Sequence, residues 1–326
     1  MLRAADQPLP VLCLAGPTGS GKTELALQLS RRLGCEVINT DSRQVYADFP
    51  IICAQPRPEE LSQCPHHLYG KLKIEEKISA GQWCSMAEDC IREVLRRGHV
   101  PLLVGGTGMY FHTLLHGMAP IPAIDPRLRA QLEARVESEG PEKLHAELGA
   151  IDPDYAIRIH PHDRQRIVRA LEVAAQTGHT LSWWHAQKSL QSPRAQGPLF
   201  VFQAPMTWLE PRLKRRIDQM LEMGALEEAQ KAYTLCADGE APGWSAIGCA
   251  ELLAFLQGRL SFENCLALWY QNTRAYAKRQ NTWFRGRKEA IFFPAEASDQ
   301  FLSQAEDAWQ NLCAQSLGNA SGGRHA

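Results

Sequence analysis

One stretch strongly limits what this chain can fold into. Residues 16–23 read Gly-Pro-Thr-Gly-Ser-Gly-Lys-Thr and match the pattern G-x-x-x-x-G-K-[ST] at every fixed position. An apolar run, Val11–Ala15, precedes the stretch, and residues 24–33 follow it with leucines at helical spacing. A strand, a glycine-rich loop and a helix in this order predict a phosphate-binding loop rather than a turn that binds nothing.

The residue types in this loop suit a bound polyphosphate. Gly19 and Gly21 let the backbone turn its N–H groups inward, and the following helix directs the positive end of its dipole to the same point. Lys22 supplies a positive charge for the outer phosphate, and Thr23 supplies a hydroxyl that can bind a Mg²⁺ ion bridging phosphate oxygens. The predicted phosphate-binding residues are Gly16, Pro17, Thr18, Gly19, Ser20, Gly21, Lys22 and Thr23.

Composition narrows the class of protein. With 326 residues, 44% of them hydrophobic, the chain is long enough for two domains or for one domain with a large insertion. Its formal net charge is −1, so a nucleic acid would have to be bound by local basic patches. The ten cysteines include no C-x-x-C pair, which favours thiols in a reducing compartment over disulfides or zinc. No apolar run approaches the roughly 20 residues that span a bilayer, so we expect a cytoplasmic protein without a membrane partner.

An acidic residue follows the second predicted strand. Residues 36–40 form this strand, and Asp41-Ser-Arg-Gln-Val-Tyr46 comes directly after it. Ligands of an open parallel sheet lie beyond the carboxyl ends of its strands, so we expect Asp41 to face the same crevice as the phosphate-binding loop. Asp41 and Gln44 also have the spacing of a helix capping box, and this structural role stays open beside the functional one.

The next predicted strand, residues 101–104, runs into Gly105-Gly-Thr-Gly-Met-Tyr110. A nucleotide hydrolase would be expected to place a Mg²⁺-binding carboxylate here, and this stretch has none. Its glycines allow close approach of the backbone to a phosphate or substrate, and a tight turn into a helix is the alternative. Between the two strands, His66 and His67 lie in a proline-rich loop without a second Cys/His cluster, which favours packing or hydrogen bonding over metal binding.

The alternation of strand and helix stops between residues 113 and 197. This region reads as helices, and the strand-like residues 199–203 return the chain to the sheet. We therefore predict an α/β fold: a P-loop NTPase-like core with a parallel sheet, residues 1–112 and 198–313, plus an all-α insertion domain, residues 113–197. After its last strand the core is expected to be helical, and residues 314–326 are expected to be disordered.

Two predicted helices, within residues 163–177 and 272–288, carry basic side chains opposite an apolar face. The second stretch contains six basic residues and no acidic one. A single cationic face is more often solvated than functional, but two such faces and a basic cluster at residues 212–216 indicate contacts to a phosphate backbone. The side chains concerned are Arg166, Arg169, Arg274, Lys278, Arg285, Arg212, Lys214, Arg215 and Arg216, with Gln165 beside the first pair.

Five motifs occur in order: Gly-Pro-Thr-Gly-Ser-Gly-Lys-Thr at 16, Asp-Ser-Arg-Gln-Val-Tyr at 41, Gly-Gly-Thr-Gly-Met-Tyr at 105, Asp-Arg-Gln-Arg-Ile-Val-Arg-Ala-Leu-Glu at 163 and Ala-Lys-Arg-Gln-Asn-Thr-Trp-Phe-Arg at 277. This set resembles the tRNA dimethylallyltransferases, the isopentenyl transferases that modify an adenosine beside the anticodon. The resemblance covers roughly residues 9–290, and no motif after the first would suffice alone.

The resemblance implies a P-loop core whose helical insertion grips the anticodon stem-loop of tRNA. The substrate is then dimethylallyl diphosphate in place of a nucleotide, the cofactor is Mg²⁺, and we expect a monomer. Its dimethylallyl group would pass to the exocyclic amine of the adenosine 3′-adjacent to the anticodon, with release of diphosphate. A diphosphate leaving group needs charge neutralisation but no activated water, which accounts for the missing carboxylate.

The implied catalytic residues are Asp41 as general base, Lys22, Arg216, and Thr23 as metal ligand. The implied tRNA contacts are Asp41, Ser42, Arg43, Gln44, Thr107, Arg129, Gln165, Arg166, Ile167, Val168, Arg169, Ser245, Ala246, Ile247, Gly248, Cys249, Ala250, Lys278, Arg279, Gln280, Trp283 and Arg285. One segment departs from the family pattern of Gly-Tyr and a basic residue: this chain reads Gly248-Cys249-Ala250, without the aromatic and the cation.

Three other functions stay open from sequence. A small-molecule kinase would share the phosphate-binding loop but would use ATP and a lid, and release of ADP would reveal it. An adenylate isopentenyltransferase would share the loop and Asp41 but has little use for RNA-facing helices. A P-loop protein that only binds RNA is disfavoured by Asp41 and Thr107, which lie where a reacting group would be.

Overall fold

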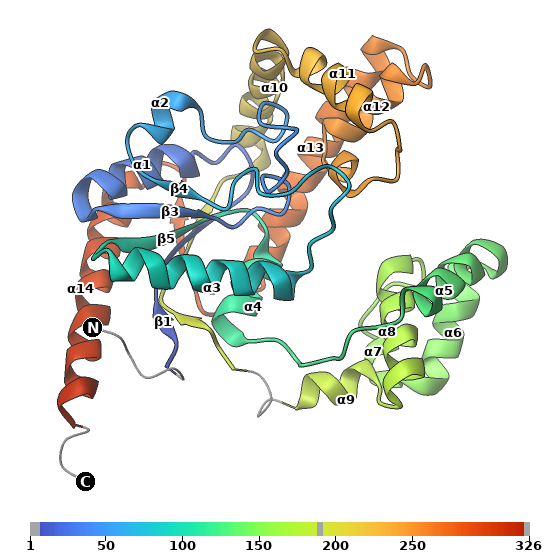
Figure 1. Cartoon of the computed structure of the whole chain (residues 1–326), viewed down its shortest axis with the longest axis horizontal. Helices are drawn as coiled ribbons and strands as arrows, with labels where there is room; N and C mark the ends of the chain where they lie inside the picture. Colours follow the sequence, from blue (N-terminus) through green and yellow to red (C-terminus); the bar gives the residue numbers. More distant parts are fainter. Residues whose placement is uncertain (1–6, 188–191, 323–326) are drawn as a thin grey trace. The chain divides into compact units, whose positions relative to one another are not determined.

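The computed structural model describes residues 7–187 and 192–322. The chain forms two compact units (Figure 1): a core unit, Met1–Leu115 with Arg194–Ala326, and a helical unit, His116–Pro193. The predicted limits of the insertion, 113 and 197, differ from these limits by three and four residues. No helix among the described residues is long and apolar enough to cross a membrane.

The core unit is built on a sheet of six parallel strands in the order β4-β3-β5-β2-β7-β8. The strands are β2 Leu12–Ala15, β3 Cys35–Asn39, β4 His66–His67, β5 Val100–Gly105, β7 Leu199–Gln203 and β8 Ala290–Pro294. Two shorter strands, β1 Leu9–Pro10 and β6 Ala195–Gln196, form a separate parallel pair. Because the strands of the large sheet are parallel, the loops that follow β2, β3 and β5 meet at one edge.

Helices cover both faces of the sheet, so its central strands are apolar on both sides. Alternate residues of β2 point to opposite faces. Cys13 belongs to the cluster formed with α3 Ala80–Arg96, and Leu14 belongs to the cluster formed with α1 Lys22–Leu33 and α14 Ser298–Gly322. Figure 1 shows α3 across one face and α14 beyond the other. This three-layer arrangement fixes the edge where β2, β3 and β5 end.

The remaining helices of the core unit lie in the loops and after β7. They are α2 Pro58–Leu61, α4 Gly108–His116, α10 Met206–Glu222, α11 Ala225–Leu235, α12 Cys249–Leu256 and α13 Phe262–Arg285, with a 3-10 turn at Pro242–Ser245. The tight turn into a helix after Gly105 is thus present as the start of α4.

Two expectations about secondary structure are wrong. The proline-rich loop that contains His66 and His67 includes α2 and the edge strand β4, which are too short to leave a periodic pattern. The region after β7 is not all helical, because β8 adds an edge strand whose Phe293 packs on α14. Residues 314–322, expected to be disordered, form the last part of α14, which Phe301 and Leu302 anchor in the core. Residues 323–326 lie outside the described part.

The helical unit contains α5 Pro126–Glu139, α6 Pro141–Ile151, α7 Pro153–Ala156, α8 Arg164–Thr177 and α9 Leu181–Ala186. Its helix starts follow from sequence: Asp125 accepts a hydrogen bond from Arg127 N before α5, and Asp163 accepts one from Arg166 N before α8. The apolar faces of α5, α6 and α8 form a core of their own that includes Leu132, Leu144 and Ile167.

Candidate active site

The phosphate-binding loop has the predicted geometry. Gly19 and Gly21 adopt φ values of 80° and 88°, in the left-handed region that favours glycine, and Gly21 is the N-cap of α1. The first backbone amides of a helix lack intrahelical partners and lie at the positive end of its dipole. The loop between β2 and α1 therefore presents donors and partial positive charge to an anion.

Lys22 is the first residue of α1, and its side chain folds back over the loop. Its Nζ donates hydrogen bonds to Gly16 O at 2.9 Å and to Pro17 O at 2.7 Å. Burial lowers the pKa of Lys22 to about 7, the Asp41 carboxylate acts in the opposite direction, and the Arg216 guanidinium lowers it further. An anionic ligand would stabilise the charged form, so this ammonium is suited to bind a diphosphate.

Arg216 lies on α10 and is the one member of the basic cluster at 212–216 that points into the protein. Burial lowers the pKa of its guanidinium, and the Asp41 carboxylate raises it. In the part of the chain that the structure describes, Lys22, Arg216 and Asp41 form no ion pair within 4.0 Å. Two cations and a carboxylate thus interact electrostatically without neutralising one another in direct contact.

Two hydroxyls of the loop fit a bound diphosphate and a Mg²⁺ ion. Ser20 is 3% exposed, and its Oγ has no hydrogen-bond partner among the described residues. A ligand oxygen would remove the cost of about 1–3 kcal/mol for an unsatisfied buried donor. Thr23 is exposed in the first turn of α1. The described residues contain no cluster of three or more His, Cys, Asp or Glu that could hold a metal, so Mg²⁺ would depend on Thr23, ligand oxygens and water.

Asp41 follows β3 at the same edge of the sheet. Its Oδ1 accepts a hydrogen bond from Arg43 N at 2.9 Å, and its own N–H donates to Asn39 Oδ1 at 2.8 Å. The predicted capping box is wrong, because residues 41–45 form turns rather than a helix and Gln44 Nε2 donates to Cys53 O and Ala54 O. The carboxylate is instead held in an Asx turn, which fixes one oxygen.

The turn after β5 packs against protein on the Cβ side of its glycines. A Cβ on Gly106 would lie 2.0 Å from Gln280 Nε2, and one on Gly108 would lie 2.1 Å from the Trp283 ring. The absence of a side chain at both positions is thus required for packing, and close approach of this backbone to a phosphate or substrate stays a prediction. Their small size admits helix α13, which carries Gln280 and Trp283.

Thr107 connects the turn to the Asp41 segment. Its Oγ1 accepts a hydrogen bond from Ser42 N at 3.0 Å, and its N–H donates to Thr40 O at 3.2 Å. Burial raises the pKa of the Tyr276 phenol on α13 and the Thr107 side chain acts in the opposite direction, so these two side chains lie close together. The loops after β3 and β5 are thus held to each other and to α13.

Several predicted tRNA contacts are buried, and the prediction is corrected for their side chains. Ile167 and Val168 lie in the core of the helical unit because they occupy the apolar face of α8. Ala246 and Cys249 lie in the core of the other unit, and Gly248 packs against Trp269, 2.7 Å from where its Cβ would be. Gln280 is also buried, with hydrogen bonds inside the protein.

The other predicted RNA-facing residues are at least partly exposed, and many of them already have partners. In the helical unit, Arg166 pairs with Asp163 and Arg169 with Glu172, both at 2.6 Å. Exposed Arg129 pairs with Glu133 at 2.8 Å, and Gln165 is exposed. In the core unit, Arg43 donates to Ser245 Oγ at 2.6 Å. The remaining exposed or half-buried ones are Ser42, Gln44, Thr107, Ile247, Ala250, Lys278, Arg279, Trp283 and Arg285.

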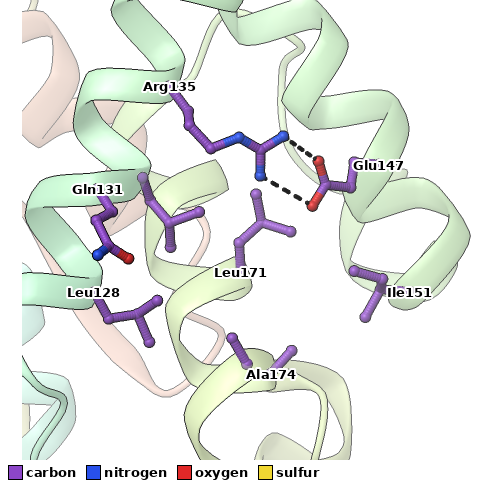
Figure 2. A pocket seen from close by; sticks show the side chains of 9 residues that line it. Leu128, Gln131, Arg135, Glu147, Ile151, Leu171 and Ala174 are labelled. Atoms are coloured by element: carbon purple, nitrogen blue, oxygen red, sulfur yellow. Dashed lines mark hydrogen bonds and ion pairs between the residues drawn. The ribbon is translucent and has the colours of Figure 1, made fainter.

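The cavity in Figure 2 belongs to the helical unit and has a volume of about 360 Å³. Its wall is largely apolar, with Leu128, Leu171 and Ile151, and Arg135 and Glu147 form an ion pair at 2.7 Å beside it. The charges near it neutralise each other, and none of the predicted catalytic residues lines it. We therefore place the candidate active site at the carboxyl edge of the sheet.

The internal role of Gln280 was not predicted from the sequence. Gln280 lies on the cationic helix, and helical periodicity alone does not separate a polar residue facing solvent from one facing a polar turn. The spacing of Tyr276, Gln280 and Trp283 on one side of α13 was the available signal, because residues at i, i+4 and i+7 share a helix face.

The fold and the site define a class: parallel α/β proteins of the P-loop type that bind a phosphate-bearing ligand but lack the carboxylate of a nucleotide hydrolase after β5. The chain belongs to the IPP transferase family, whose sequence profile matches residues 44–287. The resemblance read from the five motifs is thereby confirmed.

Named relatives agree with this assignment. The chain is 60% identical over 300 residues to a tRNA dimethylallyltransferase of Desulfovibrio desulfuricans, covering 92% of this chain and 93% of that protein. The crystal structure of the full-length tRNA isopentenylpyrophosphate transferase from Bacillus halodurans matches with 31% identity and a TM-score of 0.68, over 94% of this chain and 99% of that one. A eukaryotic dimethylallyltransferase, crystallised acting on tRNA, matches with 29% identity and a TM-score of 0.76, over 95% and 80%. The predicted fold class is confirmed.

Proposed function

We propose that this protein transfers a dimethylallyl group from dimethylallyl diphosphate to the exocyclic amine of the adenosine 3′-adjacent to the anticodon in tRNA, and releases diphosphate. The observation that carries the proposal is the set Lys22, Arg216 and Asp41 beside a phosphate-binding loop. This set has charges for an anionic leaving group and a base for an incoming nucleophile, and no carboxylate follows β5, where a nucleotide hydrolase would be expected to bind Mg²⁺.

The leaving group is the first half of the proposed reaction. As the bond between the allylic carbon and the diphosphate oxygen breaks, negative charge grows on the diphosphate. The Lys22 ammonium, the Arg216 guanidinium and the amides at the start of α1 would stabilise that charge. The hydroxyls of Ser20 and Thr23 would hold the diphosphate and a Mg²⁺ ion, which would supply further neutralisation when bound.

The nucleophile is the second half. The lone pair of an adenine amine is delocalised into the ring, so the amine attacks weakly unless a base orients it and removes its proton. The new carbon–nitrogen bond forms as the carbon–oxygen bond breaks, and the amine proton passes to the Asp41 carboxylate. The hydrogen bond from Arg43 N fixes Oδ1, which leaves Oδ2 for the substrate. The adenosine must leave its stack, which is easier in an anticodon loop than in a duplex.

Exposed or half-buried cations supply the proposed contacts to tRNA. In the core unit these are Lys278, Arg279 and Arg285 on α13, and in the helical unit they are Arg166 and Arg169 on α8. Such contacts position an RNA backbone without reading its sequence. All proposed catalytic residues lie in one core unit, so we propose a monomer, acting in the cytoplasm where tRNA is available.

The decisive test is incubation with labelled dimethylallyl diphosphate and, in separate reactions, an anticodon stem-loop or AMP. We expect label in the stem-loop only. Label in AMP would indicate an adenylate isopentenyltransferase, and release of ADP from ATP with a small-molecule acceptor would indicate a kinase. Binding of RNA without any transfer would contradict the proposal as well.

A further inference from the structure

Gln280 occupies an unusual position for a polar residue on a cationic helix. It lies near the carboxyl end of α13, is 5% exposed, and joins two loops of the sheet edge. Thr18 N, within the phosphate-binding loop, donates to Gln280 Oε1 at 2.9 Å, and Gln280 Nε2 donates to Gly106 O at 3.0 Å. One side chain thus connects three segments that are far apart in sequence.

The chemistry of the two partners fixes the orientation of the Gln280 amide. A backbone N–H can only donate and a carbonyl can only accept, so Oε1 must face Thr18 and Nε2 must face Gly106. The absence of a side chain on Gly106 is required as well, because a Cβ there would lie 2.0 Å from Nε2.

The neighbouring residues of α13 hold the helix in the same register. Tyr276 lies beside the Thr107 side chain, and the Trp283 ring packs where a Cβ on Gly108 would be. Tyr276, Gln280 and Trp283 therefore contact consecutive residues of the turn after β5. Gln280 is the member of this row that also hydrogen-bonds the phosphate-binding loop.

We propose that Gln280 is a positioning residue for the diphosphate site: it holds the phosphate-binding loop at Thr18 in its ligand-ready conformation from the helix that carries the exposed cations. Anion binding by such a loop depends on inward-pointing backbone amides, and a loop ordered before binding loses less conformational entropy. The inference rests on the proposed function for the identity of the ligand. It concerns binding of the diphosphate rather than proton transfer or RNA affinity.

The test compares Gln280→Met, which keeps the length and packing of the side chain but removes both hydrogen bonds, with Gly106→Ala, which displaces the amide without changing it. Asn281→Ala is the matched control, because Asn281 is the buried neighbour on α13 and donates to Ala204 O at 3.0 Å rather than to the phosphate-binding loop. Affinity for inorganic pyrophosphate is measured by calorimetry, affinity for the anticodon stem-loop by filter binding, and folding by melting temperature.

We expect Gln280→Met and Gly106→Ala to weaken pyrophosphate binding roughly tenfold, since one or two net hydrogen bonds no longer organise the loop. The KM for dimethylallyl diphosphate should rise in proportion, while stem-loop affinity and kcat stay within about threefold. Asn281→Ala should lower the melting temperature without changing pyrophosphate affinity.

Pyrophosphate affinity that is equal in wild type and Gln280→Met, or lowered equally by Asn281→Ala, would overturn the inference. If neither test variant folds, hydrogen exchange on wild type decides: the Thr18 amide should be protected without ligand, and rapid exchange would contradict the proposal. Failure of the wild type to transfer a dimethylallyl group would contradict the proposed function instead. The pyrophosphate affinities would still test whether Gln280 positions the phosphate-binding loop.

Discussion

Glu36 lies at the start of β3, and Asp41 lies two residues beyond its end. A carboxylate is therefore found at each end of this strand. Glu36 is 1% exposed and accepts hydrogen bonds from Arg97 at 2.6 and 3.0 Å, from His99 at 2.5 Å and from His67 at 2.6 Å. Asp41 is half-buried near two cations, and neither forms an ion pair with it.

The two ends of β3 differ in whether the protein itself neutralises the buried charges there, and the pKa values show this difference. Burial alone would raise the pKa of Glu36, but its hydrogen bonds to Arg97, His99 and His67 outweigh burial and lower the pKa to about 2. At the other end, burial lowers the pKa of Lys22 to about 7 because no carboxylate neutralises it in direct contact. A buried charge that the protein pairs is costly to unpair, whereas a charge left for a ligand lowers the stability of the free protein and marks a functional site.

The largest expected effect is on catalysis by Asp41. Asp41→Asn keeps the shape of the side chain and the hydrogen bond from Arg43 N but removes its basicity. General-base contributions are on the order of 10²–10⁴ in rate, so single-turnover transfer with saturating tRNA and dimethylallyl diphosphate should fall by that factor. A variant within about threefold of wild type, far below that range, would make Asp41 a turn cap or a binding contact.

Lys22→Ala and Thr23→Ala should come next, with transfer lowered on the order of 10²–10³, because each removes stabilisation of the diphosphate. Affinity for tRNA should survive in a filter-binding assay, since the loop binds the diphosphate and other cations bind the RNA. An equal loss of tRNA affinity would refute this division of roles.

Glu36→Gln tests the structural end of β3. Removing one partner of a buried ion cluster costs about 3 kcal/mol in the free energy of unfolding, while transfer at a temperature where the variant is folded should stay unchanged. The folded pKa of Glu36 is below its usual 4.5, so its contribution is complete above pH 4.5 and is lost as pH falls toward 2. Denaturant unfolding from pH 7 to pH 3 should show this loss in wild type and less of it in the variant; equal slopes would contradict it.

The smallest expected effect concerns the helical unit. Replacing Arg166 and Arg169 with alanine should weaken tRNA binding and reduce the slope of log K against log salt by roughly 0.7–0.9 for each RNA phosphate that no longer binds a cation. Arg135→Ala is the control, because this arginine of the same unit pairs with Glu139 and Glu147. Melting is followed in parallel, since Arg169 also partners the buried Glu172. An unchanged slope would mean that this face is only solvated.

The surroundings of the two ends of β3 also show how much of the site can be predicted from the sequence. The phosphate-binding loop was predictable because each fixed residue of its motif is needed for the local conformation or charge, such as the positive φ of Gly19 and Gly21. The position of Asp41 followed from the rule that parallel strands end at one edge. Hydrogen bonding by His67 was predicted, but its partner Glu36 was not, because the pairing depends on strand order.

Contacts between residues far apart in sequence also limit what could be predicted for the turn after β5. Gly106 and Gly108 were expected to allow close approach of a ligand, and α13 packs on their Cβ side from more than 170 residues away in sequence, as the Gln280–Gly106 separation of 174 shows. Ile167 and Val168 belong to a motif that the family resemblance assigns to RNA contact, but both are buried, as helical periodicity, which places them on the apolar face of α8, indicates.

The charge state of Lys22 tests the central claim most directly, namely that the carboxyl edge of the sheet holds charge which only a ligand satisfies. NMR titration of lysine-labelled protein, with Lys22→Arg to assign the signal, measures its pKa with and without pyrophosphate. We expect a pKa of about 7 in the free protein, so the cation is present below pH 7 and lost above it, and a higher pKa with pyrophosphate bound. A pKa near the usual 10.5 without ligand would contradict the account.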